Sequence, residues 1–245
     1  MRYKVICCYN GTGYSGSQRQ LNSQTVQGQI ERALAKIYSR PLTIQAASRT
    51  DKGVHALGQV FHYDVDTVID SAKLVQVINR QLPDDIRILS AVPVTADWHA
   101  RYDVSCKTYY YRLSTAEQYD VFQKDICYQY NQAFDKAKAG DLAKAFLGKH
   151  DFKAFMAAGS DKQNTIRTIY DINFDQQGDL LTMQISGDGF LYHMVRIMMG
   201  LFLDYVEGKK SSDDIIEQFT AGNRHYFRRT APACGLYLAN VRYKL

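Results

Sequence analysis

The stretch Ser48-Arg49-Thr50-Asp51-Lys52-Gly53-Val54-His55 joins two apolar segments, residues 42–47 before it and residues 58–65 after it. Both segments are typical of strands, so the sequence predicts a tight loop between two strands with Asp51 at its tip. Polar side chains on loops that strands hold in place often carry out chemistry. A simple hairpin turn is the alternative interpretation, because Asp and Gly are common turn residues.

The elements around this loop predict a ferredoxin-like first half. The expected strands are 3–9, 42–47, 58–65 and 86–92. The first expected helix is 25–39, and a second helix is marked by the apolar positions Leu74, Val77, Ile78 and Leu82. Asp70 or Ser71 is expected to cap the second helix, and Pro83 follows its end. The glycine-rich segment 11–17 lacks the phosphate-loop pattern and is expected to shape a turn. The order β-α-β-β-α-β is the split βαβ arrangement of ferredoxin-like domains.

The second half is expected to repeat this theme less regularly. The expected strands are 107–114, 165–174, 180–186 and 236–243, and the expected helices are 134–147, 190–206 and 215–219. Residues 176–179 are expected to form a hairpin turn, and Ser212 or Asp213 to cap the last helix. No low-complexity linker separates the halves. We therefore expect an α+β protein with subdomains at 1–100 and 101–245, the first of which carries the Asp51 loop.

Composition places the chain among ordinary globular proteins. It has 245 residues, of which 46% are hydrophobic and 22% charged, and its net charge of +5 permits a polyanionic partner without requiring one. The 18 tyrosines are expected to serve mostly in packing, although tyrosine also stacks on bases.

Cysteine and histidine usage argues against disulfide and metal-binding classes. The five cysteines contain no C-x-x-C pair, so we expect unpaired thiols in a reduced, cytoplasmic protein. The six histidines show no zinc-binding pattern, and no cofactor motif is present, so no metal or cofactor is expected. No apolar stretch approaches the length of a membrane span, and the N-terminal apolar run is too short for a secretory signal.

Three further segments carry side chains suited to binding. In the first, Tyr109 and Tyr111 share one face of a strand with Lys107, which suggests either aromatic packing or a ring that stacks on a ligand. In the second, the helix expected at 190–206 begins directly after two glycines, and His193 and Arg196 are spaced to project from one face. A helix start attracts anions, and a solvent-facing pair is the alternative.

The third segment is basic. Arg224, His225, Arg228 and Arg229 precede the last strand, where they would form either a solvated surface cluster or a phosphate contact.

Together, these segments resemble the tRNA pseudouridine synthase A family. The matching motifs occur in the family's order, from the first strand to the last. They are Tyr9-Asn10-Gly11-Thr12, Gln18-Arg19-Gln20, Arg49-Thr50-Asp51, Gly53-Val54-His55, Phe61-His62, His99-Ala100-Arg101, Lys107-x-Tyr109-x-Tyr111, Gly189-Phe190-Leu191-Tyr192-His193-Met194-Val195-Arg196 and Ala231-Pro232-x-x-Gly235-Leu236-Tyr237-Leu238.

The resemblance implies a fold and a function. The expected fold is the pseudouridine synthase fold, with two ferredoxin-like α/β subdomains that form an extended mixed, mainly antiparallel sheet with the active cleft between them. The expected enzyme is a cytoplasmic homodimer that isomerises uridines at positions 38, 39 and 40 of the tRNA anticodon stem-loop without a metal or organic cofactor. Asp51 matches the catalytic aspartate. The matches for substrate binding are Tyr109, Arg196, Arg49 and His193, and the expected RNA contacts are Arg19, Lys52, Arg224, Arg228 and Arg229.

These residue types suit the reaction. Asp51 is expected either to add to the sugar as a nucleophile or to remove the 2′ proton, and the sequence leaves both routes open. Arg196 is the expected partner of its carboxylate. The target base must leave the stem to enter the pocket, and Tyr109 would stack on the detached ring. Arg49 would fill the space left by the base or contact the RNA backbone.

Four positions depart from the family pattern, in which Asp, Trp, Gly and Ala are usual. They are Asn10, Ser17, Ser48 and Lys52. Ser17 loses an aromatic ring and Lys52 adds a cation beside Asp51, so we expect both to influence which uridines are modified.

Two other classes of protein remain as alternatives, a non-catalytic RNA-binding protein and a ferredoxin-like enzyme for small molecules. The intact Asp51, Tyr109 and Arg196 disfavour the first, and the basic segment and the lack of a cofactor motif disfavour the second.

Overall fold

The computed structural model describes residues 1–159 and 163–244. The chain folds into two compact units, which we call unit 1 and unit 2. Unit 1 contains Met1–Ser105 and the closing residues from Tyr237 onward, and unit 2 contains Cys106–Leu236. The division into subdomains at about residue 100 stays a prediction, and we describe each unit separately.

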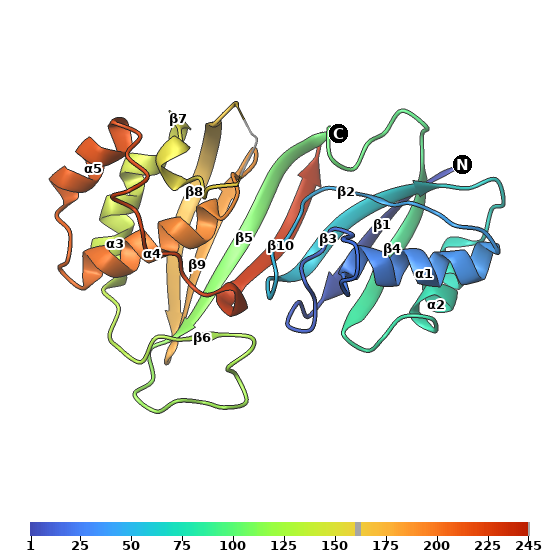
Figure 1. Cartoon of the computed structure of the whole chain (residues 1–245), viewed down its shortest axis with the longest axis horizontal. Coiled ribbons are helices and arrows are strands. Elements are labelled where there is room, and N and C mark those ends of the chain that lie inside the picture. The colour runs from blue at the N-terminus through green and yellow to red at the C-terminus, as the bar shows by residue number, and fades with distance from the viewer. Residues whose placement is uncertain (160–162, 245) are drawn as a thin grey trace. The chain divides into compact units, whose positions relative to one another are not determined.

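Unit 1 has the predicted β-α-β-β-α-β order. Its elements are β1 (Arg2–Tyr9), α1 (Val26–Tyr38), β2 (Gln45–Ala46), β3 (His55–Asp64), α2 (Ser71–Asn79), β4 (Ile86–Val94) and β10 (Leu236–Tyr243). Strand β1 pairs antiparallel with both β3 and β4, and β2 pairs antiparallel with β3. The order β4-β1-β3-β2 is that of a ferredoxin-like sheet. Strand β10, red in Figure 1, pairs in parallel with β3, although the two are far apart in the sequence.

The helices of unit 1 begin where the sequence predicts. Thr25 caps α1 by accepting a hydrogen bond from the Gly28 amide, and Asp70 caps α2. The strand predicted at 42–47 is wrong in length, because β2 has only two residues. The buried carboxylate of Glu31 on α1 accepts the Ile44 amide at 3.1 Å, so a side chain takes a backbone donor that a longer strand would pair.

Unit 2 repeats much of this order. Its elements are β5 (Val104–Ser114), β6 (Tyr128–Gln129), α3 (Lys136–Ala143), η1 (Lys144–Phe146), β7 (Gly148–Asp151), η2 (Lys153–Phe155), β8 (Ile166–Gln177), β9 (Leu180–Gly187), α4 (Met194–Val206), α5 (Ser212–Thr220) and η3 (Ala233–Gly235). The strands lie in the order β5-β9-β8-β7 with antiparallel pairing, and β6 pairs in parallel with β5. The α+β class with mixed, mainly antiparallel pairing is confirmed within each unit.

Three boundaries in unit 2 correct the sequence predictions. The helix predicted at 134–147 ends at Ala143 and continues as a 3₁₀ turn, and β7 begins at Gly148. The helix predicted from residue 190 begins four residues later, because His193 adopts a left-handed conformation (φ 60°) that a helix interior does not allow. The cap of α5 is Ser211, one residue before the predicted pair.

Aromatic side chains fill much of both cores. In unit 1, Tyr3 stacks on Tyr63 with 5.8 Å between ring centroids. In unit 2, Phe155 packs against Phe219 and Phe227, and Phe146 packs edge-on against Phe202. The exposed tyrosines are Tyr102, Tyr119, Tyr170 and Tyr192. The expectation that most tyrosines serve in packing is therefore confirmed.

Candidate active site

Asp51 lies at the tip of a tight turn between β2 and β3. Its carbonyl accepts a hydrogen bond from the Val54 amide at 3.1 Å, which closes the turn. Gly53 occupies the third position of this turn with φ +78°, a conformation that glycine adopts without steric cost. The Asp51 side chain is half-buried, whereas its neighbour Lys52 is exposed. The predicted strand-loop-strand placement of this carboxylate is confirmed.

Thr50 anchors this turn to the rest of unit 1. Its amide donates to the Ser17 hydroxyl oxygen at 2.8 Å, and its carbonyl accepts the Ser17 amide at 3.0 Å. Its own hydroxyl hydrogen-bonds the Tyr9 hydroxyl at 2.8 Å. Thr50 and Ser17 are both buried, at 6% and 7% exposed. The residue directly before Asp51 is therefore held by its backbone and its side chain.

Two glycines allow the 11–17 segment to pack against the Asp51 turn. A Cβ at Gly11 would lie only 2.0 Å from the Val54 carbonyl oxygen, and a Cβ at Gly16 would lie 3.0 Å from the Thr50 carbonyl oxygen. The Gly11 amide also donates to Nδ1 of His55 at 3.1 Å, and the His55 ring stacks on Tyr237 of β10 with 4.6 Å between centroids. The expectation that these glycines shape a turn is confirmed, and the close approach explains why side chains are excluded there.

The predicted cations of unit 1 lie on its surface. Arg49 and Lys52 are exposed and flank Thr50 and Asp51 in the sequence. Arg19 is also exposed and donates to the buried carboxylate of Glu31 at 3.2 Å. Ser17, in contrast, faces inward toward Thr50, so its side chain supports the Asp51 turn.

Tyr109 lies on β5 of unit 2 and is buried. Its ring packs edge-on against Phe190 with 5.1 Å between centroids. Tyr111, two residues along the same strand, is fully buried and donates its hydroxyl to the Pro232 carbonyl at 2.8 Å. Burial raises the pKa of Tyr111 well above its ordinary value, which keeps the phenol neutral. The predicted common face of the two tyrosines is confirmed by their shared burial.

Arg196 lies on the first turn of α4. Its Nε donates to the Ala231 carbonyl at 2.8 Å, and the Ala231 amide donates back to the Arg196 carbonyl at 3.0 Å. His193 precedes the helix as its N-cap residue, and Arg196 is the third residue of the helix, so the common face expected for the two side chains stays a prediction. Its ring lies 4.0 Å from that of Tyr192. Asp188 accepts the Thr168 amide at 3.0 Å, as expected of a turn or cap residue.

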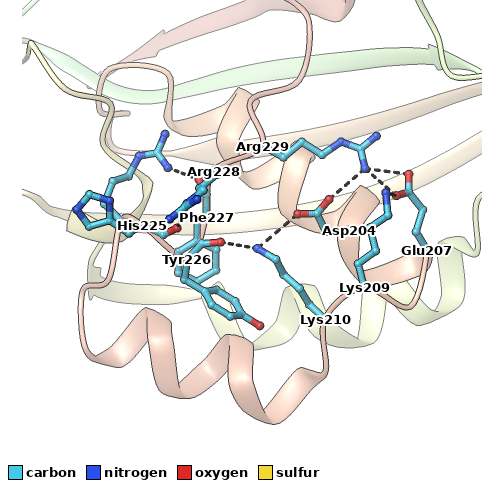
Figure 2. A network of polar contacts seen from close by, with 10 residues as sticks. Asp204, Glu207, Lys209, Lys210, His225, Tyr226, Phe227, Arg228 and Arg229 are labelled. Atoms are coloured by element: carbon cyan, nitrogen blue, oxygen red, sulfur yellow. Dashed lines mark hydrogen bonds and ion pairs between the residues drawn. The ribbon is translucent and has the colours of Figure 1, made fainter.

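The basic segment at the end of unit 2 is largely engaged by the protein itself. Arg229 pairs with Asp204 at 3.1 Å and with Glu207 at 2.8 Å (Figure 2). Arg228 is exposed and donates its Nε to the His225 carbonyl at 2.9 Å, and Arg224 donates to the Phe227 carbonyl. Of the three arginines, Arg228 is the most open to solvent.

Several residues of these environments had no role in the sequence interpretation. They are Tyr9, Glu31, Asp204 and Glu207. Their partners lie far away in the sequence, and only the quoted motif around Tyr9 gave a signal. The described residues contain no group of three or more His, Cys, Asp or Glu side chains that could hold a metal ion. Among the helices of 1–159 and 163–244, none is long and apolar enough to cross a membrane.

The chain matches known proteins over nearly its whole length. A profile of the family described as tRNA pseudouridine synthase matches residues 6–103 and 142–244. The tRNA pseudouridine synthase A of Bacillus pumilus is 40% identical over 245 residues, which cover 99% of each chain. That of Limosilactobacillus fermentum is 38% identical over 247 residues, which cover 99% of this chain and 96% of the relative. The protein called tRNA pseudouridine synthase A 1 in Bacillus cereus is 39% identical over 243 residues, with 99% and 98% covered.

Proposed function

This chain belongs to the tRNA pseudouridine synthase family and is an isomerase that acts on uridine in tRNA, and from that premise we propose its target and its catalytic residues. The proposed targets are uridines 38, 39 and 40 of the anticodon stem-loop. The relatives of the same length carry the name tRNA pseudouridine synthase A, and the motifs of that family run through this sequence in order.

Asp51 is the proposed catalytic residue. The observation that carries this assignment is the half-buried carboxylate on a turn whose preceding residue is fixed by three hydrogen bonds, since a catalytic group must be held in place before the substrate arrives. Pseudouridine formation breaks the bond between N1 of the base and C1′ of the sugar and forms a bond from C5 of the base to C1′. Asp51 either adds to the sugar carbon or removes the 2′ proton, and both routes need the ionised carboxylate.

Tyr109 and Arg196 are the proposed substrate-binding partners of Asp51. A buried tyrosine ring braced edge-on by Phe190 is suited to stack on a uracil that has left the helix. Arg196 is the proposed partner of the Asp51 carboxylate and favours its charged form. Arg49 and His193 are proposed to contact the nucleotide, because the family motifs include both.

The proposed RNA contacts are the cations of the surface. Arg19, Lys52 and Arg228 are exposed and able to meet phosphates, and Arg224 contributes at the same loop as Arg228. A homodimer in the cytoplasm is the proposed working form, as the family resemblance implies.

The test is a comparison of pseudouridine positions in tRNA from cells with and without this protein. We expect pseudouridine at positions 38, 39 and 40 to disappear without the protein and to return when it is supplied. The purified protein should also convert these uridines in a transcribed tRNA with no added metal or cofactor. Loss of pseudouridine at other positions only would overturn the proposed target and leave the family assignment intact.

A further inference from the structure

We propose that Arg229 is a positioning residue for Arg196, and that it acts by clamping the segment 229–231 along helix α4. This inference rests on the proposed role of Arg196 at the reaction site. It replaces the expectation that Arg229 contacts a phosphate. The clamp has three points of contact on one face of α4, at Arg196, Gly200 and the pair Asp204 and Glu207.

The first point is the reciprocal pair between Arg196 and Ala231. One hydrogen bond runs from Arg196 Nε to the Ala231 carbonyl at 2.8 Å, and the other from the Ala231 amide to the Arg196 carbonyl at 3.0 Å. Because Nε lies at the base of the planar guanidinium, the position of one backbone oxygen fixes the plane of the charged group. A shift of Ala231 would therefore reorient Arg196.

The second point is Gly200, one helical turn beyond Arg196. A Cβ at this position would lie 2.2 Å from the Arg229 carbonyl oxygen and 2.7 Å from the Arg229 carbonyl carbon. The backbone of the segment therefore touches the helix backbone with no room for a methyl group. Residues four apart lie on one face of a helix, so Arg196, Gly200 and Asp204 present a continuous track.

The third point is the charge network drawn in Figure 2. Arg229 Nη1 lies 2.8 Å from Glu207 and 3.1 Å from Asp204, and all three side chains are largely buried, at 27%, 11% and 13% exposed. Lys210 pairs with Asp204 at 3.4 Å and donates to the Tyr226 carbonyl at 2.5 Å. Asp204 thus holds Arg229 directly and Tyr226 through Lys210, on either side of Phe227 in the sequence.

This network leaves Arg229 poorly suited to bind RNA. Two carboxylates at the end of α4 already accept its donors, and Tyr130 adds a hydrogen bond to Glu207 at 2.8 Å. A phosphate would have to displace these partners and would meet the two negative charges beside them. The neighbouring Arg228 carries no such pairing among the described contacts and stays on the surface.

The test uses two variants and two matched controls. Arg229→Met removes the charged clamp while it keeps a long side chain, and Gly200→Ala pushes the segment away without removing any charge. Gly140→Ala is the control for the glycine, because a Cβ there meets nothing within 4 Å. Lys144→Met is the control for the cation, because Lys144 is 73% exposed in an ion pair with Asp141.

We expect both test variants to lower the single-turnover rate at saturating tRNA at least tenfold, since a misplacement of about 1 Å can cost about a hundredfold. RNA affinity and its salt dependence should stay within twofold of wild type, and both controls should behave as wild type. The Nε–H signal of Arg196 in ¹⁵N NMR, assigned by its loss in Arg196→Lys, should shift or broaden in both test variants. Thermal melting will show that the variants compared are folded.

Two results would overturn the proposal. One is an unchanged rate and Arg196 signal in folded Gly200→Ala protein. The other is weaker binding of Arg229→Met with a salt slope reduced by about one and an unchanged rate, which would make Arg229 a phosphate contact. A wild-type protein that forms no pseudouridine, together with the expected change in the Arg196 signal, would refute the proposed function and support the clamp.

Discussion

At the scale of single residues, the environment of Thr50 decides how firmly Asp51 is held. The Ser17 hydroxyl accepts the Thr50 amide at 2.8 Å in a buried site. Removing that oxygen leaves a buried donor unsatisfied, which costs about 1–3 kcal/mol. We predict that Ser17→Ala lowers the single-turnover rate about tenfold while RNA affinity is kept. Rapid-quench assays and equilibrium binding on the same tRNA measure the two quantities.

The matched control is Ser15→Ala in the same loop. Ser15 makes its described hydrogen bonds through its backbone. Its amide donates to the Gln24 carbonyl, and its carbonyl accepts a hydrogen bond from the Gln20 side-chain amide. This variant should keep the wild-type rate. If Ser17→Ala kept that rate as well, or if it weakened RNA binding instead, the support of Asp51 by Ser17 would be refuted.

The Asp51 loop was predictable from the sequence, and its support was not. An acidic residue between two apolar strands is a local pattern, and the turn with Gly53 follows from local backbone preferences. The bond between Ser17 and Thr50 joins residues 33 positions apart. Nothing in the spacing of the sequence predicts that pair. The departure from the family pattern at Ser17 suggested an influence on the choice of uridine, and the structure adds that the side chain is buried against Thr50.

At the scale of elements, ion pairs from Arg229 to Asp204 and Glu207 join helix α4 to the segment after α5. Glu207 is a carboxylate of this network whose pKa is shifted. Burial would raise the pKa of Glu207, but hydrogen bonds from Lys209, Arg229 and Tyr130 outweigh it and lower this pKa to about 2. Because the folded pKa lies below the ordinary value of 4.5, the carboxylate stabilises the folded state fully above that pH. This stabilisation is lost as the pH falls from about 4.5 toward 2.

We predict that Glu207→Gln lowers the free energy of unfolding at pH 7 by about 1.5–3 kcal/mol, the range for hydrogen bonds to a charged group. The difference from wild type should shrink as the pH falls below 4.5. Denaturant titrations at pH 7, 5, 4 and 3 measure it, with Asp141→Asn as the control for an exposed ion pair. A difference that stays constant down to pH 3 would contradict the assigned network.

Most elements were predictable where the pattern is periodic and long. The helix α1, the hairpin of β8 and β9 and the last strand β10 agree with the sequence prediction, because alternating or helical spacing decides each of them. The start of α4 was not predictable, because the left-handed His193 delays the helix and no local rule marks that residue. The shortness of β2 depends on Glu31, which is distant in the sequence.

At the scale of the whole molecule, we expect net charge and dimer formation to govern RNA binding. The chain carries a net charge of +5, and four of the proposed cations remain for phosphates once Arg229 is assigned to the clamp. We predict a homodimer whose affinity for tRNA falls with a log–log salt slope of about −2.8 to −3.6 per subunit, since each of the four phosphate contacts contributes about −0.7 to −0.9. Light scattering and binding at several salt concentrations test both parts. A monomer at micromolar concentration, or binding that salt does not weaken, would contradict the prediction.

The sequence pattern was least able to predict which unit contains the last strand. Tyr237 and Leu238 pair with His55 and Ala56 of β3, about 180 positions earlier, and the residues from Tyr237 onward belong to unit 1. The periodic pattern predicts the strand but carries no information on its partner. Family motifs at both ends of the chain implied a shared fold, and the pairing itself became visible only in the structure.

The central claim is that Asp51 carries out the isomerisation, and single-turnover pseudouridine formation on an anticodon stem-loop tests it most directly. The wild type, Asp51→Ala and Asp188→Ala are compared, with melting and binding measured for each. We predict that Asp51→Ala melts near the wild-type temperature, binds the RNA and forms no detectable pseudouridine, because a loop carboxylate adds little to packing and phosphate contacts supply the affinity. Asp188→Ala should stay active. Substantial turnover by Asp51→Ala, or loss of turnover in Asp188→Ala alone, would contradict the account.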